Sequence, residues 1–171
     1  MFDNLESPKC KGYLLSVDPA TKSGFALFHM DSNELIDVLA VSSKSTDTWG
    51  ARVNYITSEV STYFADYIDD IKYIIFENNK SSSPLLNGIA VAVTGCAPGA
   101  KVNERLCGIS PSSWKAWIRR ESGLPIAKPK GIEALALVAP EHVEICDGSD
   151  DCADAVIMGL YWLNCKKPNN W

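Results

Sequence analysis

Four acidic residues stand next to apolar sequence, where an unpaired charge is costly. Asp18 and Glu77 each end a short apolar run, whereas Asp151 and Asp154 lie at the start of a long apolar C-terminal segment. Because Asp151 and Asp154 are three residues apart, a helix would place both on one face. A carboxylate beside buried residues must be paired, hydrogen-bonded or bound to a metal.

The four acids together predict a metal-dependent hydrolase. Like charges gathered in a low-dielectric site repel one another, and divalent cations relieve that repulsion. Oxygen ligands favour Mg²⁺ or Mn²⁺. Two such ions suit phosphodiester hydrolysis, because one activates water and both stabilise the displacement at phosphorus. We therefore predict two Mg²⁺ ions as cofactors, with Mn²⁺ also supporting activity, and the following metal ligands and catalytic residues: Asp18, Glu77, Asp151 and Asp154.

A simpler interpretation exists for each acid. Asp18 can cap a turn through its side chain, because Pro19 follows it and Gly24 comes soon after. Acids at the start of a helix complement the helix dipole, which suits Asp150 better than Asp154. Small neighbours on both sides of Asp154 leave room for another group to approach, which favours a binding role for Asp154.

The elements that must position these acids alternate between strands and helices. Period-two and continuous apolar runs predict strands, and apolar residues at three- and four-residue steps predict helices. The order of these elements indicates a mixed α/β sheet with helices on its faces. Strands are predicted at residues 13–17, 25–28, 35–41, 72–76 and 102–109. Helices are predicted at residues 49–68, 85–94, 131–139 and 150–165, and a further helix begins at residue 111. A short extended link is predicted at residues 142–146.

Length and composition indicate one ordinary globular domain spanning residues 1–171, with a short polar N-terminus and a polar C-terminal tail. The net charge of −5 disfavours nucleic-acid binding, although two divalent cations would offset four of those charges. No apolar run is long enough to span a membrane, and the N-terminus lacks a signal-peptide core. The six cysteines form no CxxC pair, which predicts reduced, mostly buried thiols in the cytoplasm or another reducing compartment.

Basic residues concentrate between residues 110 and 131, the part of the chain best suited to contact phosphates. This stretch also contains Trp114 and Trp117, which we interpret mainly as buried anchors of an amphipathic helix. The predicted phosphate contacts are Lys115, Arg119, Arg120, Lys128 and Lys130.

The motifs resemble those of the RuvC-like Holliday junction resolvases of the RNase H-like superfamily. The matching segments cover nearly the whole chain in order: VDPATKSGFA, IIFEN, SPSSWK and DDCADAVIMG. In that family the first acid ends strand one, the second ends strand four, and the last two form a D-x-x-D-A pattern. Those positions correspond here to Asp18, Glu77, Asp151 and Asp154. Ala20 replaces the glycine usual in bacterial members, so the first motif looks more like phage-type members.

The resemblance implies an RNase H-like mixed five-stranded sheet flanked by helices and a crossover junction endodeoxyribonuclease. Such an enzyme acts as a homodimer on branched DNA and cuts a four-way junction by paired symmetric nicks, in a bacterial or phage-infected cell. The resemblance also implies a functional lysine at Lys115 and a second at Lys128 or Lys130. Asn78 and Lys80, which follow the second acid, correspond to a segment that contacts DNA near the cut.

Three alternatives remain open. The chain could be a broader nuclease of flaps and forks, a junction-binding protein without catalysis, or a distant relative of actin-like ATPases, which have longer chains. For the homodimer, the nearly all-apolar helix predicted at residues 85–93 is the candidate contact surface. The alternative to a dimer contact is that this helix is buried in the core of a single chain.

Overall fold

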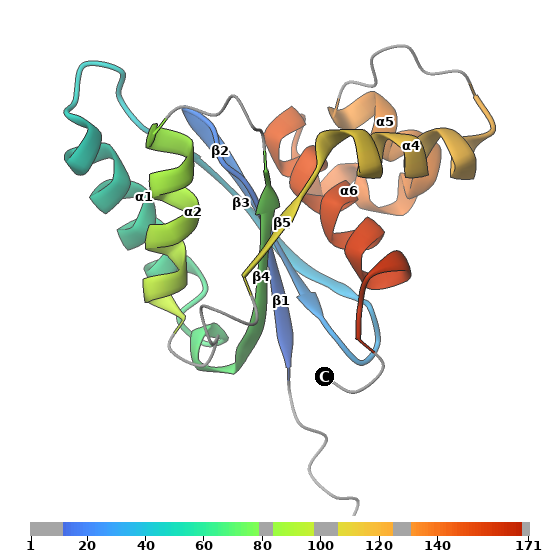
Figure 1. The fold of residues 1–171 in the computed structure, drawn as a ribbon, viewed down its shortest axis with the longest axis horizontal. Helices are drawn as coiled ribbons and strands as arrows, with labels where there is room; N and C mark the ends of the chain where they lie inside the picture. The colour runs from blue at the N-terminus through green and yellow to red at the C-terminus, as the bar shows by residue number, and fades with distance from the viewer. Residues whose placement is uncertain (1–11, 79–83, 98–105, 125–130, 169–171) are drawn as a thin grey trace, which may run out of the picture.

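A computed structural model describes residues 12–78, 84–97, 106–124 and 131–168. One five-stranded sheet runs through the domain in the order β3-β2-β1-β4-β5 (Figure 1). β2 is antiparallel to both β1 and β3, whereas β4 is parallel to both β1 and β5. This confirms the predicted mixed five-stranded sheet. The strands are β1 (Tyr13–Asp18), β2 (Lys22–His29), β3 (Leu35–Ser42), β4 (Ile71–Glu77) and β5 (Leu106–Ile109).

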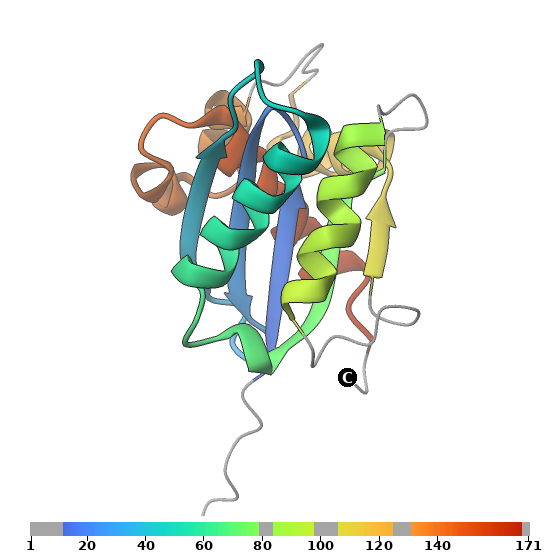
Figure 2. The ribbon, with the colours of Figure 1, turned by 90° about the vertical axis from the view of Figure 1, so that its left-hand side faces the viewer.

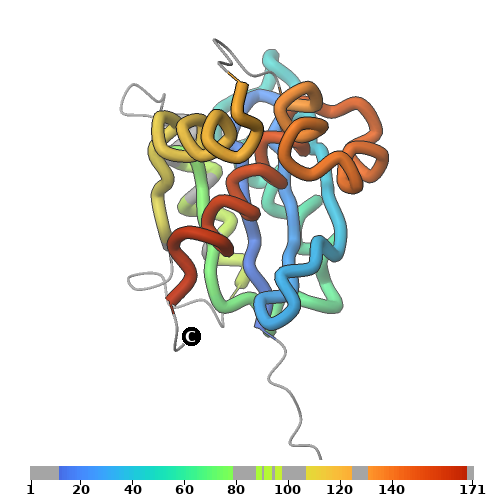
Figure 3. Tube along the Cα trace, turned by 90° about the vertical axis from the view of Figure 1, so that its right-hand side faces the viewer, coloured from blue at the N-terminus to red at the C-terminus, as the bar shows by residue number. Residues whose placement is uncertain are grey.

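Helices cover both faces of the sheet. α1 (Trp49–Tyr63) and α2 (Pro84–Cys96) lie side by side on one face (Figure 2). α4 (Pro111–Ser122), α5 (Gly131–Val138) and α6 (Asp150–Cys165) lie on the other face (Figure 3). None of the helices in the described ranges has the length and apolar character needed to cross a lipid bilayer.

The pleat of β1 and β4 decides on which face their terminal acids lie. Leu14 and Ile75 pack into the cluster of buried residues beneath α4, α5 and α6. Side chains alternate between the faces of a strand, so Asp18, four residues after Leu14, belongs to the same face. Glu77, two residues after Ile75, does too. Both strand-end acids therefore lie on the α6 side of the sheet.

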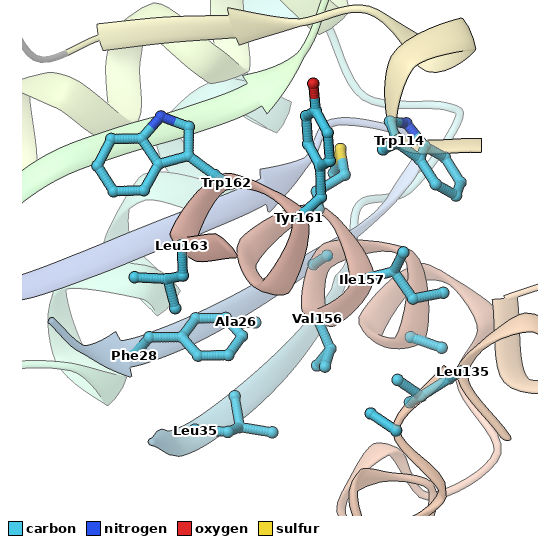
Figure 4. Close-up of a cluster of buried hydrophobic side chains, with 14 of the residues drawn as sticks. Ala26, Phe28, Leu35, Trp114, Leu135, Val156, Ile157, Tyr161, Trp162 and Leu163 are labelled. Atoms are coloured by element: carbon cyan, nitrogen blue, oxygen red, sulfur yellow. The ribbon is translucent and has the colours of Figure 1, made fainter. Parts of the chain in front are cut away.

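α6 is the central helix of that side and supplies much of its core. It crosses β1 and β2, and its residues from Cys152 to Leu163 are almost all buried. Figure 4 shows Val156, Ile157 and Leu163 of α6 packed among strand and helix side chains. Because α6 is anchored along its length, the position of its first turn over the sheet is fixed by packing.

Three predicted elements differ from the structure. The strand predicted at residues 25–28 is β2, which begins at Lys22, so Gly24 lies in the strand and not in the preceding turn. α1 ends at Tyr63 instead of near Ile68, because the chain turns there to enter β4 through a 3₁₀ turn at Ile68–Asp70. The apolar pattern continues past the helix end since the turn residue Phe64 is also buried. The predicted extended link at residues 142–146 is wrong: two 3₁₀ turns, Pro140–His142 and Glu144–Cys146, fold this segment compactly.

The buried face of α2 belongs to the core of one chain. Ile89 and Val93 are 0% exposed and pack with the sheet, whereas Val91 is 59% exposed. The sequence-based choice of this apolar face as a dimer surface is therefore wrong for Ile89 and Val93, because a single chain already covers them. The buried-helix alternative describes both residues.

The cysteines are less buried than predicted. All five in the described residues are free thiols, but two are buried, two are half-buried, and Cys165 is exposed.

Candidate active site

Asp18 and Glu77 end two neighbouring parallel strands. In the β1–β4 register Val17 lies opposite Phe76, so the next residue of each strand is one of the two acids. The carboxyl ends of parallel strands meet at one edge of a sheet, which is a common place for a ligand site. Both side chains are partly exposed at this edge.

The first turns of α6 bring the other two acids to the same edge. Ser149 caps the helix, and its side chain accepts a hydrogen bond from the backbone N–H of Cys152 at 3.3 Å. Asp151 and Asp154 then follow on one face of the helix, as their spacing predicts.

Gly24 allows α6 to begin directly over the sheet. It lies opposite Asp18 in the β1–β2 register. A Cβ atom at Gly24 would be 2.0 Å from the Asp151 carbonyl oxygen and 2.7 Å from the Cys152 nitrogen. No side chain fits there, so the missing Cβ lets the helix backbone carry Asp151 close to the end of β1.

We expect Gly24→Ala to move the start of α6 and to destabilise the protein by ~1–3 kcal/mol, as overpacking does in cores. Chemical denaturation would measure the loss. Gly50→Ala in α1 is the matched control, because nothing lies within 4 Å of a Cβ placed there. That control should be neutral or stabilising, since alanine favours a helix over glycine. Equal stabilities of the two variants would contradict the close approach.

The acids interact electrostatically across these elements. Burial, together with the charges of Asp154, Glu77 and Asp151, raises the pKa of Asp18 to about 8, while Lys115 acts to lower it. Burial raises the pKa of Asp154 to about 7; Lys115 acts to lower it, and Glu77 is among the acids that act to raise it. The structure therefore brings together the four predicted acids and Lys115.

Several features of this cluster fit a divalent cation. Asp154 Oδ1 is buried without a hydrogen-bond partner, and buried oxygens of this kind usually have one. The surrounding donors are carboxylate oxygens, the ligands that Mg²⁺ prefers. Within the described ranges, no three acidic, histidine or cysteine side chains are already placed to hold an ion together.

The raised pKa of Asp18 gives a prediction about stability. Its folded-state pKa of about 8 exceeds the ordinary value of 3.8, so the folded protein holds this proton more tightly than the unfolded chain. Raising the pH from about 4 to 8 therefore lowers the free energy of unfolding. Asp18→Asn removes this effect, and we expect it to stabilise the metal-free protein by ~2 kcal/mol or more near pH 8.5.

Denaturation with a chelator at pH 5 and pH 8.5 would measure this stabilisation. The advantage of Asp18→Asn should shrink toward acid pH, where the folded wild-type protein keeps its proton. Asp31→Asn, at an exposed position, is the control and should change stability little at either pH. A gain for Asp18→Asn that is the same at both pH values would contradict the assigned pKa.

α4 contributes a cation and a hydrogen-bond donor to the site. Lys115 is half-buried beside the acids, and its Nζ lies 4.8 Å from the centre of the Trp114 ring. The Trp114 indole N–H donates to Glu77 Oε2 at 3.1 Å. The prediction of buried tryptophans is confirmed, but no local pattern indicated that one of them contacts an acid.

The other predicted DNA contacts are placed differently. Arg119 and Arg120 are exposed on α4, and Arg120 pairs with Glu121 at 3.0 Å. Asn78 donates its backbone N–H to Ile109, and its side chain lies against Gly108. Asn78 directly follows Glu77, so its side chain lies on the opposite face of the sheet from the acids. Lys80, Lys128 and Lys130 lie outside the described residues.

Two further residues adjoin the acids. Lys22 Nζ lies 4.0 Å from Asp151 Oδ2, a contact that was not predicted. Its position four residues after Asp18, at the start of β2, was the available signal. Asp150 accepts a hydrogen bond at 3.0 Å from the backbone N–H of Ile132, so it caps the start of α5. This agrees with the interpretation of Asp150 as a capping residue, although the helix it caps was not foreseen.

Comparison with known proteins gives matches in structure only. No protein-family model and no curated protein sequence matches the chain. Thermus thermophilus RuvC solved with a Holliday junction substrate has a TM-score of 0.64 and 16% identity, covering 88% of this chain and 92% of that one. Another structure of the same RuvC has a TM-score of 0.62 and 14% identity, covering 89% of this chain and 95% of that one.

The nuclease domain of human cytomegalovirus terminase is also similar. It has a TM-score of 0.51 and 13% identity, covering 96% of this chain and 88% of that domain. Identities this low establish similarity of fold. The chain therefore has the RNase H-like fold and is structurally similar to RuvC Holliday junction resolvase, as the resemblance of its motifs implied.

Proposed function

We propose that the chain is a metal-dependent DNA endonuclease that resolves four-way junctions by paired symmetric nicks. The observation that carries the proposal is the convergence of four acids and one lysine at the ends of β1 and β4. The same RNase H-like fold occurs in RuvC solved with a Holliday junction substrate, which supports junction DNA as the substrate class.

In the proposed mechanism the four acids hold two Mg²⁺ ions. These ions supply water activation and charge stabilisation when bound. Asp18 and Asp154 must lose their protons to serve as ligands, because a coordinating carboxylate is ionised. Lys115 contacts a non-bridging oxygen of the phosphate at the cut. Its ammonium is held over Trp114 and would stabilise the charge that develops during displacement.

The two-fold symmetry of a four-way junction calls for a homodimer. The buried positions of Ile89 and Val93 exclude them as contact residues, so any contact through α2 must use its outer surface, where Val91 is exposed. Sedimentation of the wild-type protein tests this part of the proposal. A monomer that makes both nicks in one binding event would contradict it.

Cutting of synthetic substrates tests the function. A four-way junction, a flap, a fork and a linear duplex should be compared in Mg²⁺, with and without a chelator. We expect symmetric paired nicks in the junction alone. Equal cutting of flaps and forks would favour the broader branched-DNA nuclease. Binding without cutting would indicate a junction-binding protein that lacks catalysis.

A further inference from the structure

We infer that Trp114 is a positioning residue that fixes the Glu77 carboxylate and the Lys115 ammonium relative to each other. This inference rests on the proposed function, because it concerns how two groups of that site are held. Trp114 is 0% exposed, and its indole N–H donates to Glu77 Oε2 at 3.1 Å. The face of the same ring lies beneath Lys115 Nζ.

The hydrogen bond constrains Glu77 in a specific way. An indole N–H can only donate, so it requires an acceptor. Leaving a buried indole N–H without an acceptor is costly, which keeps Trp114 and Glu77 together. In the described contacts this bond uses only Oε2, so the second oxygen of Glu77 is available to a cation.

Trp114 also restricts side chains that would otherwise be mobile. Glu77 ends a strand and is only partly buried, so its long side chain would sample several rotamers if nothing held it. Lys115 has a flexible stem, and the attraction between its ammonium and the face of the aromatic ring holds it in place. One buried ring thus orders a metal ligand and a phosphate contact at once.

Trp117 provides a matched control on the same helix. It is also buried, and its ring packs against Tyr161 with the centroids 6.2 Å apart. In the described part of the chain it has no hydrogen bond to an acid. Trp114→Phe and Trp117→Phe remove similar indole volume from the same core, but only the first removes the bond to Glu77.

The first experiment measures metal binding without DNA. Titration calorimetry with Mn²⁺ should show about tenfold weaker binding for Trp114→Phe. Loss of a group that orients a metal ligand typically lowers metal affinity by about 10- to 100-fold, and we expect the lower end of that range. Trp117→Phe should bind Mn²⁺ like the wild type. Equal affinities for the two variants would overturn the inference.

The second experiment requires only the wild-type fold and a variant of Glu77. In the metal-free protein the Trp114 indole N–H resonance should shift upfield in Glu77→Ala, while the Trp117 resonance stays in place. Tryptophan-to-phenylalanine variants at each of the five tryptophans assign the resonances, and the Trp114 resonance follows by elimination if its own variant does not fold. A Trp114 resonance that does not respond to Glu77→Ala overturns the inference.

The two proposals can fail separately. If the protein cuts no branched DNA, the proposed function fails. The indole shift and the weaker Mn²⁺ binding would still establish that Trp114 positions Glu77.

Discussion

Asp18→Asn and Asp154→Asn should each lower the rate of junction cutting by more than ~1000-fold. Each carboxylate is proposed to hold an ion that stabilises the transition state by several kcal/mol, and about 4 kcal/mol corresponds to a thousandfold change in rate. Junction binding should persist or tighten, because each change removes a negative charge from a site that faces phosphates. Single-turnover cutting in Mg²⁺ and binding in Ca²⁺ measure the two effects.

Asp150→Asn is the matched control for Asp154→Asn. Asp150 lies on the same helix, but its carboxylate caps α5 through the N–H of Ile132. We expect a loss of stability of about 1 kcal/mol, typical of a helix cap, with cutting retained. A normal cutting rate for Asp154→Asn would refute the role of this acid in binding the metal ions.

The positions of the four acids could be predicted because short-range patterns determine them. A carboxylate at the end of a continuous apolar run indicates the end of a buried strand, which describes both Asp18 and Glu77. A three-residue spacing at the start of a capped apolar segment indicates one helical face, which describes Asp151 and Asp154. Packing of these elements into the RNase H-like fold then brings the two pairs to one edge.

The contacts that refine the site depend on residues far apart in the sequence. Trp114 is 37 residues from Glu77, and no local pattern links an indole to that acid. The approach of the α6 backbone to Gly24 likewise depends on how the helix packs on the sheet. These contacts emerge only when the elements are assembled.

Unlike those long-range contacts, the face of the sheet on which Asn78 lies could be predicted from the sequence. Alternation along the strand already places Asn78, the residue after Glu77, on the other face of the sheet from Glu77. The end of α1 was harder to locate. Phe64 continues the apolar spacing of the helix although it lies in the turn that follows, because both segments pack into one core.

Lys115→Ala should lower the rate of cutting by about 100-fold while changing junction affinity much less. Its ammonium is close enough to the acids to influence Asp18 and Asp154, so a phosphate held at the metal ions would be within its reach. Loss of one preorganised donor to developing charge commonly costs ~100- to 1000-fold in rate. An interaction that strengthens in the transition state affects rate more than binding.

Arg119→Ala is the matched control, on the same helix but exposed. It is preferable to Arg120→Ala, which would also release Glu121 from its ion pair. If Arg119 contacts an outer phosphate, its loss should weaken binding evenly across sequences and lower the salt slope by about one, with no separate loss of rate.

Lys115→Arg keeps the charge over Trp114 and should recover part of the rate. If Lys115→Ala instead loses affinity as Arg119→Ala does and cuts at the wild-type rate once bound, Lys115 is an ordinary phosphate contact outside the transition state.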